Sequence, residues 1–370
     1  PSSPQDKLLF AILQRNAATT FGRDHGFSSI QTIADFQDAV PLSDYEDYNS
    51  SIDRIARGEP NILTRDPVTR LVPTSGSTSA RKLIPWAAGL QRDVNRAIGA
   101  WTNDLFRQNP DLKAGPAYWS VSPAVPETQP ADFRVPVGFD DDTDYLAGLA
   151  GKVIGGIMAV PPAVRHLADT DTFRFHVLLH LVAARGLRLV SVWHPTFFTL
   201  LLDSLPDHWD SIIAALRTGT APTFLPEPLH HQFQANFRSD PSRAQELDSL
   251  DSIRPDTIWP HLQLLSAWGE ATSPEVRDLT RRFPNTLFEP KGILATEAFV
   301  TIPFRDHHPL ALTSHFFEFL DADGHIHLAP ELEKSKRYEV VVTTSGGLYR
   351  YRLRDQVDVT GFLGNTPCLH

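Results

Sequence analysis

The sequence contains very little cysteine, since Cys368 is the only one among its 370 residues. A single cysteine excludes an internal disulfide and any metal cluster built on several cysteines, and it is compatible with a reducing compartment. We therefore expect a cytoplasmic protein whose fold is held together by packing rather than by covalent cross-links.

Long apolar runs are also missing. The longest of them, such as residues 197–202, are far shorter than the roughly 20 residues needed to cross a bilayer. The N-terminus carries no charged segment followed by an apolar core, so no secretion signal is visible. The sequence therefore predicts that the chain neither spans nor enters a membrane.

Positive charge is scarce, because 34 lysines and arginines face 44 aspartates and glutamates, and the net charge is -10. No basic stripe compensates for this excess, so a nucleic-acid backbone would be repelled. Three catalytic patterns are absent as well: the Walker loop G-x-x-x-x-G-K-[ST], the metalloprotease pair HExxH and the hydrolase elbow G-x-S-x-G. A nucleic-acid partner, a P-loop NTPase, a zinc protease and a serine hydrolase are therefore not expected.

Apolar residues make up 41% of the chain and charged residues 21%, as in globular proteins. At this length a single core no longer grows, so we expect two lobes or one large, elaborated domain. The chain opens at Pro1, its only methionine is Met158, and it stops at His370 after a strand-like run and the turn-like residues 364–367. These ends suggest a fragment of a longer protein.

The first hundred residues are expected to be mostly helical. Ser43 and Glu46 form a capping-box pattern that predicts a helix ending near Gly58. Two short strands, at 68–72 and 83–84, flank a polar loop, and a long helix is predicted at 88–106.

Helices and strands alternate in the middle of the chain, and this alternation predicts an α/β fold of packed sheets flanked by helices. The expected helices lie at 171–184, 197–205, 209–216 and 274–283, and the expected strands at 187–192 and 262–267. Further strands are predicted at 298–304, 316–320, 338–344 and 348–363, so the final portion is expected to be strand-rich.

The loop at residues 74–82, TSGSTSARK, gathers five hydroxyl side chains around one glycine and ends in a lysine. Hydroxyls and backbone amides at such a turn can donate to phosphate oxygens, and the lysine adds a positive charge. An ordinary polar surface turn is the alternative interpretation. The candidate phosphate-binding residues are Ser75, Gly76, Ser77, Thr78, Ser79 and Lys82, and Lys82 is also the candidate for a catalytic role.

Two later segments carry further candidates. Thr296 and Glu297 lie beside small residues, where the carboxylate could hold a magnesium ion and the hydroxyl could donate to phosphate. Asp355 ends the run LYRYRLRD, in which bulky apolar and basic residues alternate. Any half-buried strand would show the same alternation. At the inner end of such a strand, Asp355 could accept hydrogen bonds from both hydroxyls of a ribose.

Other polar groups have simpler explanations. His176 and His180 are four residues apart on a predicted helix, but without the HExxH glutamate a chance pairing is the better interpretation than a metal site. The acidic run at 140–142 fits the start of a helix better than a cation site. His194 follows a predicted buried strand, where ligand-binding residues often lie.

Taken together, these segments resemble the Gretchen Hagen family of auxin-responsive acyl acid amido synthetases, a branch of the adenylate-forming superfamily that includes luciferase and acyl-CoA ligases. TSGSTSARK resembles the family's phosphate loop, LATEA its Thr-Glu motif, and VVVTTSGGLYRYRLRDQVDVTGF its ribose motif. SAWGEA, with Gly269 and Glu270, is similar to the adenine segment. The likeness covers essentially the whole chain and is greatest for bacterial members, although the phosphate loop is one residue shorter than in plant members.

The resemblance implies a ligase that uses ATP and Mg²⁺ to adenylate a small carboxylic acid and then joins it to an amine, usually an amino acid. It implies that residues 1–370 form the large N-terminal domain, with an α/β core to about residue 300 and a strand-rich portion at 301–370. The family's smaller C-terminal domain, which supplies a lysine, is expected to be missing. A thioester-forming ligase and a nucleotide-binding protein without catalysis are the alternatives. The acid, the amine, the general base and the oligomeric state are not predicted.

Overall fold

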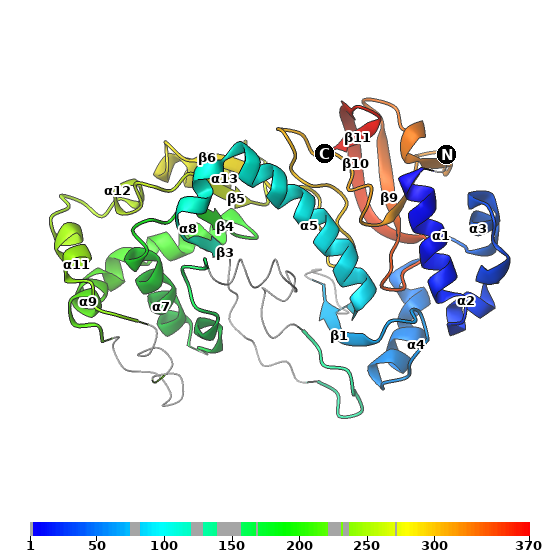
Figure 1. The fold of residues 1–370 in the computed structure, drawn as a ribbon, viewed down its shortest axis with the longest axis horizontal. Coiled ribbons are helices and arrows are strands. Elements are labelled where there is room, and N and C mark those ends of the chain that lie inside the picture. The colour runs from blue at the N-terminus through cyan, green and yellow to red at the C-terminus, as the bar shows by residue number, and fades with distance from the viewer. Residues whose placement is uncertain are drawn as a thin grey trace. The chain divides into compact units, whose positions relative to one another are not determined.

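The fold was analysed in a computed structural model, which describes residues 3–74, 82–119, 129–138, 157–167, 169–220, 231, 237–270 and 272–370. The chain divides into two compact units (Figure 1). The first unit comprises Pro1–Asp104, Glu127–Phe139 and Gly292–His370, and the second comprises Leu105–Pro126 and Asp140–Lys291. Both ends of the chain therefore belong to the first unit.

The first unit is built on a five-stranded antiparallel sheet with the order β11-β10-β9-β7-β8. Its strands are β7 (Phe316–Leu320), β8 (Ile326–Leu328), β9 (Arg337–Thr343), β10 (Tyr351–Leu363) and β11 (Thr366–Leu369). A two-residue turn joins β10 to β11, and Gly364 adopts the positive φ of 61° that such a turn requires. A separate hairpin pairs β1 (Val68–Pro73) with β2 (Leu83–Ala87).

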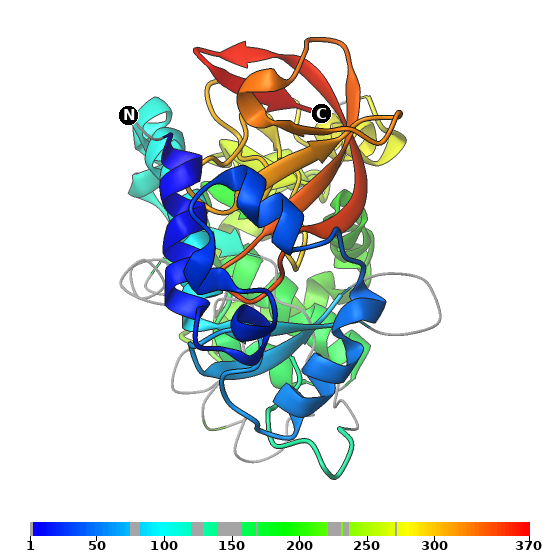
Figure 2. The same cartoon turned by 90° about the vertical axis from the view of Figure 1, so that its right-hand side faces the viewer.

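Helices at the start of the chain cover this sheet. They are α1 (Pro4–Asn16), α2 (Thr20–Asp24), α3 (Ile33–Ala39) and α4 (Tyr45–Ala56), and the long helix α5 (Ala88–Gln108) follows β2. Figure 2 shows α1 in blue beside the orange and red strands. Leu9, Ile12 and Leu13 recur at helical spacing on one side of α1 and are buried in one cluster with Phe316 and Tyr349. The cluster packs the start of the chain against β7 and the segment just before Tyr351.

The second unit contains a four-stranded parallel sheet with the order β3-β4-β5-β6. Its strands are β3 (Ala117–Trp119), β4 (Leu189–Ser191), β5 (Leu264–Ala267) and β6 (Leu287–Pro290). Its helices are α7 (Thr170–Ala183), α8 (Pro195–Asp203), α9 (Leu205–Thr218), α11 (Pro241–Asp248), α12 (Pro255–Ile258) and α13 (Pro274–Arg282).

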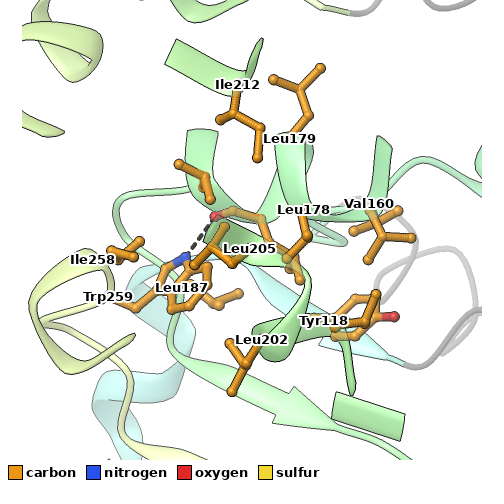
Figure 3. Packing of buried hydrophobic residues seen from close by; sticks show 14 of the residues in the cluster. Tyr118, Val160, Leu178, Leu179, Leu187, Leu202, Leu205, Ile212, Ile258 and Trp259 are labelled. Atoms are coloured by element: carbon orange, nitrogen blue, oxygen red, sulfur yellow. Dashed lines mark hydrogen bonds between the residues drawn. The ribbon is translucent and has the colours of Figure 1, made fainter. Parts of the chain in front are cut away.

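A large apolar core holds the second unit together (Figure 3). Trp259 is 1% exposed, and its indole Nε1 donates a hydrogen bond to the carbonyl oxygen of Leu181, 2.7 Å away. Arg243 is buried beside it and donates to the carbonyl oxygens of Val182 and Ile258 at 3.0 and 2.6 Å. These bonds satisfy polar groups that would otherwise be costly to bury.

The predicted α/β fold with a strand-rich final portion is confirmed, with three local corrections. The helix expected from Ser43 is capped by Asp44, whose backbone N–H donates to the Asp47 carboxylate at 2.9 Å. The hydroxyl of Ser43 is instead bound to the carbonyl oxygen of Tyr349 at 2.9 Å.

The strand expected at 298–304 is wrong. Phe299, Thr301 and Phe304 take part only in isolated bridges, and Pro303 has no N–H with which to continue a ladder. The turn expected at 364–367 is shorter than predicted, because Thr366 already begins β11.

Candidate functional site

Four of the predicted site residues, Lys82, Thr296, Glu297 and Asp355, lie in the first unit, and Gly269 and Glu270 lie in the second. Ser75, Gly76, Ser77, Thr78 and Ser79 lie outside the described residues.

Lys82 stands immediately before β2, between two tyrosine rings. Its ammonium nitrogen lies 5.7 Å from the centroid of the Tyr45 ring and 6.0 Å from that of Tyr351, and it donates to the Tyr351 hydroxyl at 3.4 Å. The backbone N–H of Leu83 donates to the Tyr45 hydroxyl at 2.7 Å. Because Tyr45 is the first residue of α4, this bond ties the chain after the loop at 74–82 to a helix.

Glu297 is buried, with 8% of its surface exposed, in a tight turn. The turn is closed by Ala295 N–H donating to the carbonyl oxygen of Ala298 at 2.9 Å, and Ile293 N–H donates to the Thr301 hydroxyl at 2.7 Å. A Cβ atom on Gly292 would lie 2.5 Å from that same hydroxyl oxygen, so only glycine fits there. Thr296 is half-buried in the same turn.

The electrostatics of Glu297 connect it to the other candidates. Burial raises the pKa of its carboxyl group, the charge of Lys82 lowers it, and the negative charge of Asp355 raises it. The Tyr351 phenol lies close to the Glu297 carboxylate and favours its ionised form. The structure therefore brings Lys82, Glu297 and Asp355 into one electrostatic neighbourhood around Tyr351.

Asp355 lies on β10, where the pairing with β9 shifts register between Arg352 and Gln356. Arg354, directly before it, has a φ of 67°, which marks a bulge. The side chain of Asp355 reaches solvent, but the surrounding protein desolvates it enough to raise its pKa, and Lys82 opposes this rise. Asp355 therefore lies in the stretch of β10 that is out of register with β9, and its side chain is exposed.

Sequence reasoning missed the two tyrosines. Burial raises the pKa of Tyr351, and the nearby charge of Glu297 adds to the rise, so the phenol stays protonated and able to donate. Tyr351 falls inside the ribose-like segment, four positions before Asp355, and could have been singled out there. Tyr45 has no signal in the sequence, because its partners are far away along the chain.

Gly269 and Glu270 follow β5 in the second unit. Gly269 has a φ of 128°, a conformation that other residues rarely adopt. Before it, Trp268 N–H donates to the carbonyl oxygen of Trp193 at 2.8 Å, and the two rings lie 5.0 Å apart. This is the carboxyl edge of a parallel sheet, where open α/β folds bind ligands.

The weaker candidates have structural roles. Burial lowers the pKa of His176 to about 4 and that of His180 to about 3, so both are neutral. In the part of the chain that the structure describes, the only set of three or more His, Cys, Asp or Glu side chains close enough to share a metal ion is Asp321, Asp323 and His325.

His194 caps α8, since its Nδ1 accepts a hydrogen bond from the backbone N–H of Thr196 at 3.3 Å. Residues 140–142 lie outside the described residues. Among the described helices, none has the length and apolar character to cross a membrane.

Comparison with known proteins identifies two domains in the chain. Residues 1–284 match the GH3 family N-terminal domain, and residues 308–370 match the GH3 family central domain. Indole-3-acetic acid-amido synthetase GH3.15 of Arabidopsis thaliana is 27% identical over 410 residues, which cover 98% of this chain and 66% of the relative. Synthetase GH3.4 of the same plant is 23% identical over 99% of this chain and 66% of its own length. The chain thus spans about two thirds of these relatives.

Solved structures show the same fold. A GH3.15 acyl acid amido synthetase in complex with 2,4-DB superimposes with a TM-score of 0.82 at 23% identity, covering 99% of this chain and 66% of that one. 2-Hydroxyisobutyryl-CoA ligase superimposes with a TM-score of 0.58 at 13% identity, covering 100% of this chain and 67% of that one. The expected fold of the adenylate-forming ligases is thereby confirmed. Because a GH3 domain matches well over half of it, the chain belongs to the GH3 family, whose motifs its sequence resembles.

Proposed function

We propose that this chain is part of a cytoplasmic acyl acid amido synthetase, which uses ATP to adenylate a small carboxylic acid and then transfers the acyl group to an amine, usually an amino acid. The observation that carries the proposal is the meeting of Lys82, Tyr351 and Glu297. Lys82 and Tyr351 are 269 positions apart in the chain, yet their side chains are hydrogen-bonded. A cluster of titratable groups from distant segments, in which burial raises the pKa of Tyr351 and of Glu297, is typical of functional sites.

Each group suits one part of ATP. Lys82 offers a positive charge to the phosphates, directly after a loop rich in hydroxyl groups. Asp355 stands out of the β10 ladder and can accept hydrogen bonds from the two hydroxyls of a ribose. Thr296 and residues 75–79 would donate to phosphate oxygens, and Gly269 and Glu270 would meet the adenine.

The donor set also fits a magnesium ion. Glu297 is a buried carboxylate whose pKa is raised by desolvation and by the negative charge of Asp355, and a hard cation would relieve both effects. Glu297 would therefore be the protein ligand of Mg²⁺. When bound, the ion would neutralise charge on the phosphates of ATP.

The proposed chemistry has two steps. A carboxylate oxygen of the acid attacks the α-phosphorus of ATP, the bond to pyrophosphate breaks, and an acyl adenylate forms. The nitrogen of the amine then attacks the acyl carbon, the bond to AMP breaks, and the amine loses a proton. In the first step the chain would contribute positioning and charge neutralisation, for which the Lys82 ammonium and the phenol of Tyr351 are suited.

A thioester-forming ligase is the second candidate, since the chain shares its fold with 2-hydroxyisobutyryl-CoA ligase. It would form the same acyl adenylate but transfer the acyl group to the thiol of coenzyme A. A nucleotide-binding protein without catalysis would bind ATP and release no pyrophosphate. The acceptor and the release of pyrophosphate therefore separate the three functions.

Pyrophosphate exchange with a panel of carboxylic acids tests the proposal, and it is measured on the full-length product of the gene because this chain spans only about two thirds of its relatives. Exchange that depends on the acid, and amide formation on adding amino acids, are expected. Glu297→Gln should reduce exchange, whereas Glu59→Gln, which removes an exposed carboxylate paired with Arg54 in the same unit, should not. Thioester formation with coenzyme A and none with amino acids would favour the second candidate, and ATP binding without exchange would favour the third.

A further inference from the structure

The parallel sheet of the second unit carries a row of polar side chains at its carboxyl edge. Trp119, Ser191, Ser266 and Glu289 are direct neighbours in register across β3, β4, β5 and β6. Side chains in register on parallel strands share one face of the sheet.

The preceding row faces the other side. Tyr118 packs in the apolar core (Figure 3) together with its register partners Val190 and Leu265. Since successive residues on a strand alternate between faces, the polar row lies on the face away from this core.

Lys291 completes the row. It lies two positions after Glu289 and therefore on the same side of β6, and its backbone N–H donates to the carbonyl oxygen of Ala267 at 3.0 Å. Its ammonium nitrogen lies 2.6 Å from the Ser191 hydroxyl and 4.9 Å from the centroid of the Trp119 ring. Because β5 lies between β6 and β4, the lysine side chain crosses β5 at the level of Ser266.

Ser266 is the unusual member of the row. It is 1% exposed, and its hydroxyl oxygen has no hydrogen-bond partner among the described residues. A buried hydroxyl without a partner is costly, so an unused donor next to a buried lysine points to a ligand.

Lys291 is 8% exposed. Burial lowers its pKa to about 7, although the carboxylate of Glu289 works in the opposite direction. An anionic group arriving beside the lysine would stabilise its protonated form. A carboxylate could then accept hydrogen bonds from the ammonium and from the two serine hydroxyls together.

We propose that Lys291, Ser191 and Ser266 form a subsite for the carboxylate of a small organic molecule, whose body lies against the indole of Trp119. The proposal rests on the ligase function proposed above, because the acid substrate carries a carboxylate and so does an amino acid acceptor. The alternative is that Lys291 only ties β6 to β4. That structural role would explain the bond to the hydroxyl of Ser191 but would not explain why the hydroxyl of Ser266 is buried without a hydrogen bond among the described residues.

Ser266→Ala separates these two roles. If the cluster is only structural, removing an unsatisfied buried hydroxyl should leave stability unchanged or raise it, and should leave ligand binding as it was. If the cluster is a subsite, the variant should keep its stability and lose about ten- to a hundredfold in affinity for carboxylates, the usual worth of one hydrogen bond to a charged group. Ser204→Ala is the matched control, because its hydroxyl donates to the carbonyl oxygen of Leu201 at the junction of α8 and α9.

The experiment is calorimetric titration of the 370-residue chain with indole-3-acetate, benzoate, glycine and aspartate, each repeated with the matching primary amide. The wild-type chain should prefer carboxylates to amides, and Lys291→Met should abolish this preference. The class that loses affinity in Ser266→Ala, aromatic acids or amino acids, identifies the substrate that uses the subsite. Urea unfolding of each variant tests whether it remains folded. If Lys291→Met does not fold, the Ser266→Ala variant alone distinguishes the subsite from a structural role.

Several results would overturn the subsite. They are the lack of carboxylate binding by the wild-type chain, unchanged affinities in Ser266→Ala, or a loss shared equally by carboxylates and amides. ATP titration of the same variants separates this failure from failure of the ligase function. If ATP binds and pyrophosphate exchange proceeds while Ser266→Ala behaves as wild type, the subsite is wrong and the function stands. If ATP does not bind while Ser266→Ala weakens carboxylate binding, the function is wrong and the subsite stands.

Discussion

The hydroxyl of Tyr351 accepts a hydrogen bond from the ammonium nitrogen of Lys82 at 3.4 Å and lies close to the carboxylate of Glu297. One phenol therefore lies close to a cation and an anion from segments that are far apart in the chain. We expect Tyr351 to act as a positioning residue, because it fixes the two charges that the proposed function assigns to the phosphates and to Mg²⁺.

Tyr351→Phe should lower ATP affinity about three- to tenfold, since the hydrogen bond that orients Lys82 and the polar contact with Glu297 are lost. Tyr338→Phe is the matched control, because its buried hydroxyl accepts a hydrogen bond from Glu333 N–H at 3.3 Å in the same unit. Calorimetry with ATP and Mg²⁺ compares the two variants. Equal affinity in both would show that Tyr351 does not position the charges.

Asp355→Asn tests the ribose contact. The variant keeps the shape of the side chain and removes its charge, which should cost about 1 to 3 kcal/mol in AMP binding. The loss should be much smaller for 2′-deoxy-AMP, which lacks one of the two hydroxyls. The same loss for both nucleotides would argue against a bond to the 2′-hydroxyl, and no loss for either would make Asp355 a surface residue of the bulge.

The fold was predictable where local patterns determine structure. Five helices of the second unit begin with a proline in the first turn, which both marks the start and suits the helix. The expected strand at 298–304 failed because apolar, β-branched residues form a strand only when a partner strand is in register, and this segment finds only isolated bridges. The strand β6 was not predicted, because it is short and its Leu287 is exposed.

The candidate site was predictable in part. Lys82, Glu297 and Asp355 stand in segments whose composition suggests phosphate or ribose binding, and the structure brings these three together. Tyr45 was not predictable, because its bond to Leu83 N–H depends on how α4 packs against β2. The polar row ending in Lys291 was equally hidden, since it arises from the register of four separate strands.

The buried histidines of α7 predict a stability that depends on pH. His176 and His180 have folded-state pKa values of about 4 and about 3, below the ordinary value of 6.5. Between pH 6.5 and 4 these two histidines therefore bind up to two more protons in the unfolded chain than in the folded chain, and their contribution to stability falls as the pH falls. The expected slope is about 1.4 kcal/mol per pH unit for each histidine.

Urea unfolding at several pH values between 7.5 and 4.5 measures this slope. His176→Gln should reduce the slope by about 1.4 kcal/mol per pH unit, because one titrating group is gone. His166→Asn, which removes an exposed histidine from the same unit, should leave the slope unchanged. An equal slope in the wild-type chain and in His176→Gln would contradict the assignment of His176 as buried and neutral.

The ion pair between Arg350 and Glu318 should matter more than its exposed counterparts. Arg350 is 5% and Glu318 1% exposed, and their charged atoms are 3.1 Å apart. Glu318→Gln should destabilise the first unit by about 3 to 5 kcal/mol, because it leaves a buried guanidinium without its counter-charge. Asp358→Asn, which breaks the exposed pair with Arg337 at 2.7 Å, should cost less than about 1 kcal/mol. Similar losses in the two variants, measured by urea unfolding, would contradict this ranking.

Lys82, Glu297 and Asp355 are assigned to one nucleotide site, and calorimetric titration with ATP is the sharpest test of that assignment. The 370-residue chain should bind ATP saturably in the presence of Mg²⁺. Glu297→Gln should weaken ATP binding more than AMP binding, because AMP lacks the phosphates that the ion would bridge. Failure of the wild-type chain to bind ATP at millimolar concentration would contradict the assignment of these residues to a nucleotide site.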